Sequence, residues 1–151
     1  LVAINTGLRI GELSHLQWKD VSLTDAPMLT VQAAYAKTGK TRHIPLNDTA
    51  KSALKAWSHQ QKDTSGFVFA TQSGERIKSV RNGWKAILKA AKIKDFHWHD
   101  LRHHFASKLV MAGVDLNTVR ELMGHGSIDM TLRYAHLAPE HKAAAVALLD
   151  N

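Results

Sequence analysis

The stretch His99-Asp-Leu-Arg-His-His-Phe-Ala-Ser107 opens a predicted helix that continues to Ala112. Apolar side chains recur along it at helical spacing and share one sector of about 80°. They are Leu101, Phe105, Leu109 and Ala112. His99 and Arg102 lie three residues apart and share the neighbouring face. We therefore expect a cation and an imidazole at the edge of a core, where they can hold a phosphate and move a proton. The alternative is an exposed polar face.

The same stretch places His99 and His103 four residues apart, a spacing that suits two metal ligands on one helix. It lacks the Glu that follows the first His in zinc proteases, and Arg102 would bring positive charge close to a divalent cation. The chain has no cysteine, which excludes a thiolate metal site and a disulfide framework. We therefore expect no metal and no cofactor.

Downstream, a helix is predicted from Asp115, its cap, to Gly124, a typical stop residue. His125 follows between two glycines and can serve a reaction or cap the helix through its charge. Tyr134 lies nine residues after His125 on the next predicted helix, which Ser127 caps. A tyrosine becomes a nucleophile only when neighbouring cations and a base help to remove its proton; otherwise it is a half-buried aromatic.

Upstream, Thr6-Gly-Leu-Arg-Ile-Gly-Glu-Leu13 holds Arg9 three residues before Glu12. The carboxylate can fix the guanidinium, or the two can form a surface ion pair of little energetic worth. Two strands are predicted at Met28–Tyr35 and Thr41–Leu46, joined by a turn at 37–40. The other predicted elements are a helix from Asn47 or Asp48 to about Gln61, a buried strand at Phe67–Phe69, a helix capped by Ser79 and a last helix from Pro139 to Leu149. The fold class is α+β, mainly helical, with a small antiparallel sheet.

The chain has 151 residues, and 20 Lys and Arg against 13 Asp and Glu give a net charge of +7. This balance favours a polyanionic partner such as nucleic acid. No apolar run approaches the roughly 20 residues of a membrane span, and we expect a cytoplasmic protein. The sequence begins at Leu1, without a Met, inside an apolar stretch. We therefore expect a larger parent protein with an upstream domain.

Four segments, in this order, resemble the characteristic boxes of the tyrosine recombinases of the phage-integrase type. Residues 6–13 resemble the first arginine box, and Lys37-Thr-Gly-Lys-Thr-Arg-His-Ile-Pro45 resembles the hairpin that carries the family's lysine. Residues 99–107 resemble the His-x-x-Arg box, and Leu122-Met-Gly-His125 with Tyr134 resembles the last box. The resemblance extends from about Leu1 to His141 and implies the integrase catalytic-domain fold. The family's core-binding domain and the first catalytic helix are absent, which implies an N-terminally truncated fragment at 1–151.

The resemblance also implies roles for individual residues. Arg9 and Arg102 would hold the scissile phosphate, and Glu12 would support them. His99 would act as acid or base, His125 as a further donor and Tyr134 as the nucleophile. Lys37 would enter near the cleavage site, with Lys40 as a competing candidate. The implied DNA-binding residues are Lys37, Lys40 and Arg42. His104 departs from the family, where Thr or Ser is more common.

The implied activity is metal-independent, site-specific DNA recombination through a 3′-phosphotyrosine intermediate. The implied partners are double-stranded DNA, three further protomers in a tetramer and possible accessory DNA-bending proteins. A type IB topoisomerase is the nearest alternative, because it shares the fold and the tyrosine chemistry. A DNA-binding module without catalysis would need only the basic charge. A metal nuclease would want clustered Asp and Glu, which the sequence lacks.

The predicted last helix is apolar around most of its girth, and such a helix does not belong in water. It can pack on its own domain or dock on a neighbouring protomer. We favour docking, because a C-terminal segment past the tyrosine commonly does so in recombinases of this type.

Overall fold

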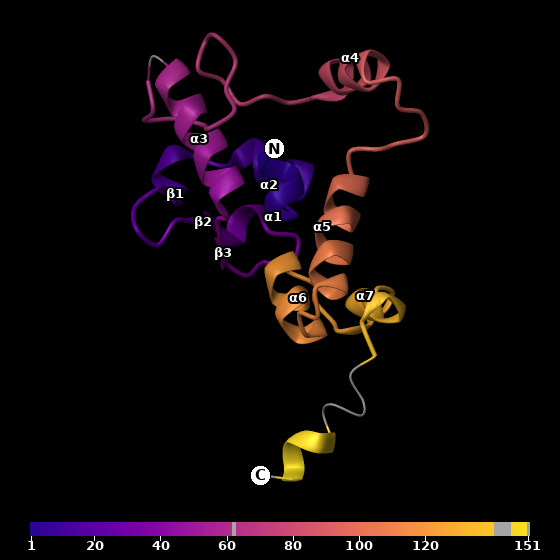
Figure 1. Cartoon of the computed structure of the whole chain (residues 1–151). Helices are drawn as coiled ribbons and strands as arrows, with labels where there is room; N and C mark the ends of the chain where they lie inside the picture. Colours follow the sequence, from indigo (N-terminus) through magenta and orange to yellow (C-terminus); the bar gives the residue numbers. More distant parts are fainter. Residues whose placement is uncertain (62, 141–145, 151) are drawn as a thin grey trace.

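A computed structural model describes residues 1–61, 63–140 and 146–150. Figure 1 shows a mainly helical chain with a small sheet near its beginning. The helices are α1 (Val2–Thr6), α2 (Ile10–His15), α3 (Asp48–Gln60), α4 (Arg81–Ala90), α5 (Asp100–Met111), α6 (Leu116–Met123) and α7 (Asp129–Leu132). The strands are β1 (Val21–Ser22), β2 (Met28–Val31) and β3 (Arg42–Pro45). Short 3₁₀ turns occur at η1 (Trp18–Asp20), η2 (Ala33–Tyr35), η3 (Ala135–Leu137) and η4 (Leu148–Asp150). The predicted α+β class is confirmed.

The sheet is antiparallel with the order β1-β2-β3, and Leu29 lies opposite Ile44 in its register. The predicted strand Met28–Tyr35 is too long, because the chain leaves the sheet after Val31. The amide of Ala36 donates to the carbonyls of Gln32 and Ala33, which closes a 3₁₀ turn in place of the last strand residues. This turn buries Ala36 and starts the exposed loop that carries Lys37.

Two other predicted boundaries are corrected. Phe67–Phe69 is not a strand but an isolated bridge, in which Phe67 pairs with Gln17. Val68 is nonetheless fully buried, because its amide donates to the Leu16 carbonyl at 2.8 Å and fixes the segment against the core. The fourth helix begins at Arg81 with Val80 at its N-cap position, and the Ser79 hydroxyl accepts from the Arg81 amide at 3.3 Å, so the predicted Ser79 still bonds to the first turn.

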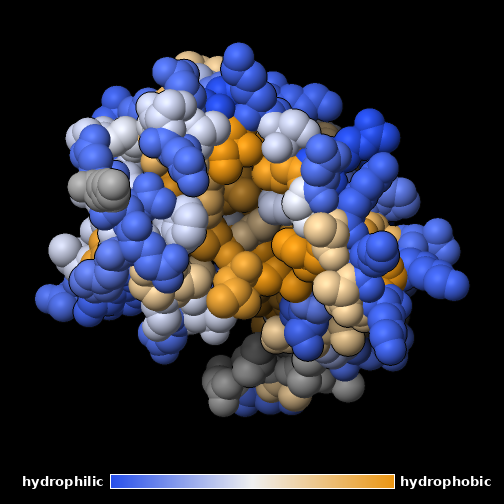
Figure 2. Space-filling model, turned by 90° about the horizontal axis from the view of Figure 1, so that it is seen from above, coloured by the Kyte–Doolittle hydropathy of each residue, from blue (hydrophilic) through white to orange (hydrophobic). Residues whose placement is uncertain are grey.

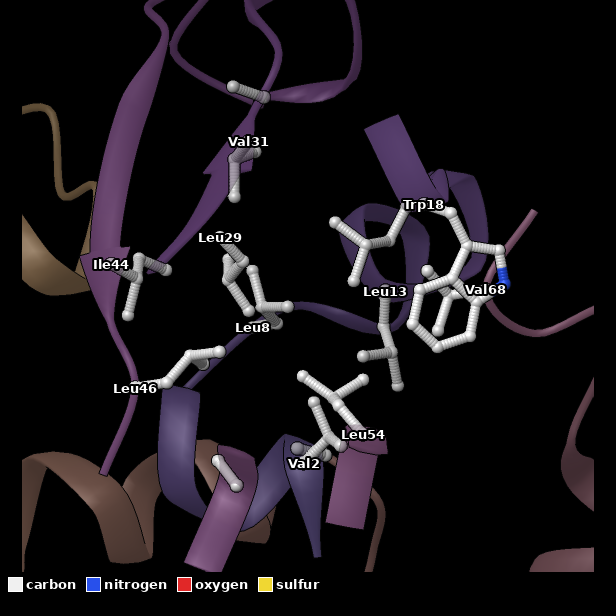
Figure 3. Packing of buried hydrophobic residues seen from close by; sticks show 14 residues of the cluster. Val2, Leu8, Leu13, Trp18, Leu29, Val31, Ile44, Leu46, Leu54 and Val68 are labelled. Atoms are coloured by element: carbon white, nitrogen blue, oxygen red, sulfur yellow. The ribbon is translucent and has the colours of Figure 1, made fainter. Parts of the chain in front are cut away.

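The larger of two hydrophobic clusters joins α1, α2, α3 and the sheet. Figure 3 shows Leu29, Ile44 and Leu54 converging with Leu8, which lies in the segment between α1 and α2. Leu29 and Leu54 are completely buried. Alternation along β2 places Leu29 and Val31 on the inner face, as expected for a strand with one buried side. This cluster fixes the start of α2 and the loop between β2 and β3, which are two of the four segments identified in the sequence.

The second cluster joins α5, α6 and the segment after α7, and Tyr134 belongs to it. Of the apolar stripe predicted on α5, Leu101, Phe105 and Leu109 pack against the two clusters, whereas the fully buried positions are Arg102, Ala106 and Val110. Leu101, Phe105 and Leu109 are only half-buried, and Ala112 is exposed. The Arg102 guanidinium is buried because it donates to two main-chain carbonyls inside the molecule.

Helix α4 stands apart from the rest of the fold in Figure 1, and none of its residues is buried. Trp84 connects it to the segment before α5, through ring contacts with Phe96 and Trp98. Figure 2 shows a hollow with an apolar floor in the face seen from above.

Within the predicted helix Pro139–Leu149, residues 141–145 lie outside the described residues. At the described end, residues 148–150 form a 3₁₀ turn, and Val146 and Leu149 are exposed. Among the described residues, no helix is both long and apolar enough to cross a membrane.

Gly7 joins α1 to the first arginine segment and has a φ of 62°, in the left-handed region. A Cβ at this position would approach Phe105 Cδ1 to 2.5 Å. We therefore expect Gly7→Ala to lower the free energy of unfolding by about 1–3 kcal/mol, from backbone strain together with the clash. Thermal or urea unfolding measures the change.

Gly11→Ala is the matched control, because Gly11 lies in α2 and a Cβ added there would meet no other atom within 4 Å. We expect that change to be neutral or stabilising, since alanine favours helix. Equal destabilisation by the two substitutions would contradict this account of Gly7.

Candidate active site

Glu12 is a buried carboxylate that organises two arginines. Its oxygens accept from the Arg9 main-chain amide at 2.8 Å and from Arg9 NH1 at 3.1 Å. Arg42 donates to both oxygens, at 3.0 and 2.8 Å. Burial acts to raise the pKa of Glu12, but the hydrogen bonds and charges of Arg42 and Arg9 hold it below its ordinary value. The carboxylate is thus charged and fixes Arg9 at the start of α2.

Arg42 is predicted to contact DNA, but its guanidinium forms hydrogen bonds within the protein. Besides its two bonds to Glu12, its Nε donates to the Leu122 carbonyl at 3.2 Å. Gly124 allows this close approach, since a Cβ there would lie 2.8 Å from Arg42 NH1. Arg42 therefore ties β3 to the end of α6.

Arg102 is a buried arginine of the site and is only 3% exposed. Its NH1 donates to the Gly7 carbonyl and its NH2 to the Met123 carbonyl. Burial, followed by the charge of Arg9, lowers the pKa of Arg102 to about 10. The guanidinium therefore remains charged at neutral pH, and it links the turn after α1 to the end of α6.

Arg9, Lys37, His99 and Arg102 line one hollow, which we call the basic hollow. Tyr35 also lines it and is 42% exposed. Burial, then the charges of His103 and Arg102, lower the pKa of His99 below its ordinary value. The basic hollow thus combines cationic donors with an imidazole that favours its neutral form, a set suited to a phosphodiester.

Lys40, the competing lysine, lines a different hollow together with Arg42 and His125. The turn between them closes with a hydrogen bond from the Gly39 amide to the Ala36 carbonyl at 2.9 Å. Gly39 has a φ of 65°, a left-handed conformation that turns the chain sharply. The structure thereby separates the two lysines and brings Lys37 to the arginines.

His125 is buried directly after the left-handed cap Gly124. Its Nδ1 lies 2.8 Å from Thr131 Oγ1, a partner on α7 that sequence reasoning did not identify. Burial, followed by the charges of Arg102 and Arg9, lowers the pKa of His125 to about 4. The imidazole is therefore neutral at pH 7, and Nε2 carries the proton when the Thr131 hydroxyl donates to Nδ1.

Tyr134 does not lie within a helix, contrary to the prediction. Helix α7 ends at Leu132, and Tyr134 begins the turn η3. The residue is 6% exposed, and its hydroxyl lies 2.6 Å from His103 Nδ1. Burial raises the pKa of Tyr134 above its ordinary value, although Arg133 and Arg102 act in the opposite direction. Tyr134 packs in the second cluster, beside the basic hollow and not among its lining residues.

His103 is the residue that sequence reasoning missed, apart from its spacing to His99. The His99 and His103 rings meet edge to face with centroids 4.9 Å apart. Within the described part of the chain, no group of three or more His, Asp or Glu residues is arranged to hold a metal ion. In the sequence, His103 directly follows Arg102, which indicates that it lies near the site. Its contact with Tyr134 could not be predicted, because the two residues are 31 positions apart.

Residues 1–141 match the sequence model of a family described as "Phage integrase family". The chain belongs to this family. It is 35% identical to the integrase of Salmonella phage P22 over 159 residues, which cover 99% of this chain and 41% of that protein. The chain therefore spans less than half the length of that curated relative.

Two solved structures share the fold. The catalytic domain of bacteriophage HP1 integrase superposes with a TM-score of 0.71 and 28% identity, over 97% of this chain and 77% of that one. The Tn1549 transposon integrase in complex with circular intermediate DNA has a TM-score of 0.78 and 24% identity, over 99% of this chain and 58% of that one. The predicted family and fold are confirmed.

The lowered pKa of His125 has a consequence for stability. Between its unfolded value of about 6.5 and its folded value of about 4, the folded state binds fewer protons than the unfolded state. The contribution of His125 is therefore complete above pH 6.5 and is lost as the pH falls through this window. We expect it to amount to roughly 1–3 kcal/mol.

Urea unfolding at several pH values measures this loss. His125→Asn cannot titrate in the window, so its stability should fall less steeply between pH 7 and 4. His59→Asn, at an exposed position of α3, should keep the wild-type slope. Identical slopes for wild type and His125→Asn would show that His125 does not carry the effect.

Proposed function

We propose that residues 1–151 act as the catalytic domain of a site-specific DNA recombinase, with Tyr134 as its nucleophile. The observation that carries this proposal is the basic hollow, where Arg9, Lys37, His99 and Arg102 converge from separate segments. Tyr134 is held beside it by His103. Membership of the phage integrase family supports the same activity.

The two arginines suit a scissile phosphate because each is fixed before substrate arrives. Glu12 holds Arg9, and two carbonyls hold Arg102. Their remaining N–H groups can donate to the non-bridging oxygens, which gain charge in the transition state. Preorganised donors of this kind contribute several powers of ten in rate. His125 lines the neighbouring hollow, and we propose that it reaches the same phosphate as a further donor through Nε2.

In the proposed reaction, Tyr134 Oη attacks phosphorus in line and forms a 3′-phosphotyrosine bond. The bond from phosphorus to the 5′-oxygen breaks, and Lys37 donates a proton to that oxygen. The O–H bond of Tyr134 breaks as the new bond forms, and His99 takes the proton. One phosphodiester is exchanged for another, so no nucleotide hydrolysis is needed. A 5′-hydroxyl of a second strand then reverses the step and joins new partners.

Tyr134 must approach the phosphate for this reaction, because its hydroxyl lies beside the basic hollow in the free chain. We propose that DNA binding draws the segment after α7 toward the hollow. The segment suits this role because α7 is only four residues long and η3 follows it directly.

Double-stranded DNA is the proposed partner, in keeping with the net charge of +7 and with the DNA complex of the Tn1549 integrase. Lys37 and Lys40 are proposed to contact its backbone, and Arg42 to act from within the protein by holding Glu12. We further propose assembly of four protomers on DNA in the cytoplasm, with accessory DNA-bending proteins as possible partners of the complex. The named relatives are integrases, which favours recombination over the topoisomerase reaction.

A nicked suicide substrate tests the nucleophile in the complete natural protein. We expect Tyr134→Phe to bind DNA with wild-type affinity and to form no covalent adduct, because only the attacking oxygen is removed. Denaturing gels and peptide mapping of the adduct give the result.

Tyr35→Phe is the matched control, since Tyr35 is exposed and lines the basic hollow. It should form the adduct normally. An adduct that survives Tyr134→Phe, or that maps to Tyr35, would refute the assignment of Tyr134.

A substrate with sulfur at the bridging 5′ position tests the general acid. Sulfur is a better leaving group and needs no proton, so it should restore cleavage to Lys37→Ala. On the ordinary substrate we expect that variant to lose about 10²–10⁴-fold in rate. Single-turnover cleavage on the two substrates measures both effects.

Lys40→Ala is the control, because Lys40 lies in the other hollow. It should weaken binding at most and gain nothing specific from sulfur. Restoration of Lys40→Ala instead of Lys37→Ala would show that Lys40 is the acid.

A further inference from the structure

Helix α7 turns a hydroxyl inward and its large apolar side chains outward. Thr131 is completely buried, whereas Met130 and Leu132 are exposed. A surface helix ordinarily places its apolar side chains on the inner face. Hydrophobic packing therefore does not account for the inward position of Thr131, and a local conflict of this kind is typical of a functional site.

The partner of the Thr131 hydroxyl is the imidazole of His125. Thr131 Oγ1 lies 2.8 Å from His125 Nδ1, and both residues are buried. A helical threonine can instead donate to a main-chain carbonyl three or four residues earlier. Among the hydrogen bonds of the described residues there is no such bond from Thr131, so its hydroxyl depends on the imidazole.

The burial of this pair decides which group donates. Burial, followed by the charges of Arg102 and Arg9, lowers the pKa of His125 to about 4, so the ring carries a single proton at neutral pH. If that proton were on Nδ1 and donated to Thr131, the hydroxyl proton would have no acceptor in the interior, which is costly. If the hydroxyl donates to Nδ1, its own proton is paired and the ring proton lies on Nε2.

The nitrogen that remains available to a ligand is thus Nε2. His125 lines the hollow that also contains Lys40 and Arg42. Arg9 connects this hollow to the basic hollow, because it lines the basic one and its NH2 donates at 3.4 Å to the carbonyl of Gly124, which lines the other. An Nε2–H group donates to a phosphate oxygen, whereas the opposite tautomer would present a lone pair that repels it. A ring that is oriented before DNA binds is a preorganised donor.

We propose that Thr131 is a positioning residue, whose hydroxyl keeps the His125 proton on Nε2 and holds the ring in place to donate to a phosphate of bound DNA. This inference rests on the proposed function, because it concerns a donor to the same phosphate. His125 is in this scheme a donor alone, and the proton of Tyr134 goes elsewhere. The resemblance in sequence assigns roles to His125 and Tyr134 and none to the threonine between them.

The pair lies ahead of the segment that is proposed to move. The amide of His125 donates to the Arg120 carbonyl at 3.0 Å, which fixes His125 to the end of α6. The amide of Thr131 donates to the Ile128 carbonyl at 2.7 Å, which fixes Thr131 within α7. Tyr134 is tied to Thr131 by a main-chain bond, from its amide to the Thr131 carbonyl at 2.9 Å. Breaking that bond would free Tyr134 while the Thr131 hydroxyl stays on the imidazole.

Single-turnover cleavage of the nicked suicide substrate by the complete natural protein is the first test, at saturating DNA. Thr131→Val replaces the hydroxyl by a methyl group of similar size, and Thr131→Ser keeps the hydroxyl. We expect Thr131→Val to cleave about 10–100-fold more slowly than wild type, by analogy with residues that orient a metal-binding histidine. Thr131→Ser should recover most of the wild-type rate.

Thr30→Val is the matched control, because it removes the same kind of bond elsewhere in the fold. Thr30 Oγ1 lies 3.0 Å from His43 Nδ1 in an exposed pair that joins β2 to β3. Neither residue lines the two hollows. The cleavage rate of Thr30→Val should therefore equal that of wild type.

A second comparison distinguishes positioning from general support of the fold. If Thr131 acts through the imidazole, Thr131→Val should not slow cleavage further in a protein that already carries His125→Ala. Loss of general support would slow both backgrounds by the same factor. Urea unfolding and DNA titration establish that each variant is folded and saturated. If His125→Ala does not fold, His125→Phe takes its place, since it keeps a ring without nitrogen.

Nitrogen NMR of protein with isotope-labelled histidine measures the tautomer directly, because protonated and unprotonated ring nitrogens resonate at different frequencies. The signals of His125 are those missing from His125→Asn. At neutral pH we expect the proton of this ring on Nε2 in the free protein. We expect the same tautomer in the complex of DNA with Tyr134→Phe, which does not proceed to cleavage.

A proton on His125 Nδ1, in either state, would overturn the proposal. A wild-type cleavage rate for Thr131→Val would overturn it as well, and so would equal slowing by this change with and without the His125 imidazole. An adduct formed equally by wild type and Thr131→Val would refute only the role of Thr131. Failure of the wild-type protein to form any adduct would refute the proposed function itself.

Discussion

The structure depends above all on one buried cation. The Arg102 guanidinium bonds to the Gly7 carbonyl and to the Met123 carbonyl, so it connects the first turn of the chain to the end of α6. An interior charge without such partners would cost several kcal/mol. Arg102 lies on the same buried face of α5 as Ala106 and Val110. The face that packs the second cluster therefore also carries a residue of the candidate site.

The charges around Arg102 are unbalanced. Arg9, Arg42 and Arg102 gather near a single buried carboxylate, Glu12. One negative charge cannot neutralise three positive ones. Burial lowers the pKa of His125 and of His99, and the charges of Arg102 and Arg9 lower both further. A phosphate would relieve this excess. We therefore infer that Glu12 serves to orient the arginines while the substrate supplies the missing charge.

Local sequence patterns predicted much of the fold and site. The stop at Gly124, the cap at Asp115 and the pairing of Arg9 with Glu12 depend on neighbours within a few residues, so spacing suffices to find them. The inward face of α5 was missed because periodicity treats an arginine as outward. The end of β2 was missed because a 3₁₀ turn buries Ala36.

Contacts between distant segments escaped prediction for a different reason. Tyr134 and His103 meet across 31 residues, and Thr131 meets His125 only because the short α7 folds back. Lys37 and Lys40 look equivalent in the sequence, since the turn that separates them is settled by Gly39 in the left-handed region. The residue types indicated which side chains could take part in the site. Only the tertiary structure shows which of them lie close together.

Tyr134 is part of a hydrophobic cluster together with Ala106, Val110, Val119 and Met123. If Tyr134 is the nucleophile, as proposed, bringing its hydroxyl to a phosphate requires opening that cluster, a local unfolding event whose free energy would add to the barrier for cleavage. The free chain would then rarely expose this oxygen, and stray nicks in DNA would be correspondingly rare. Tight packing between α5 and α6 would therefore slow the proposed cleavage. Any contact that loosens this packing, from DNA or from another protomer, would raise the cleavage rate.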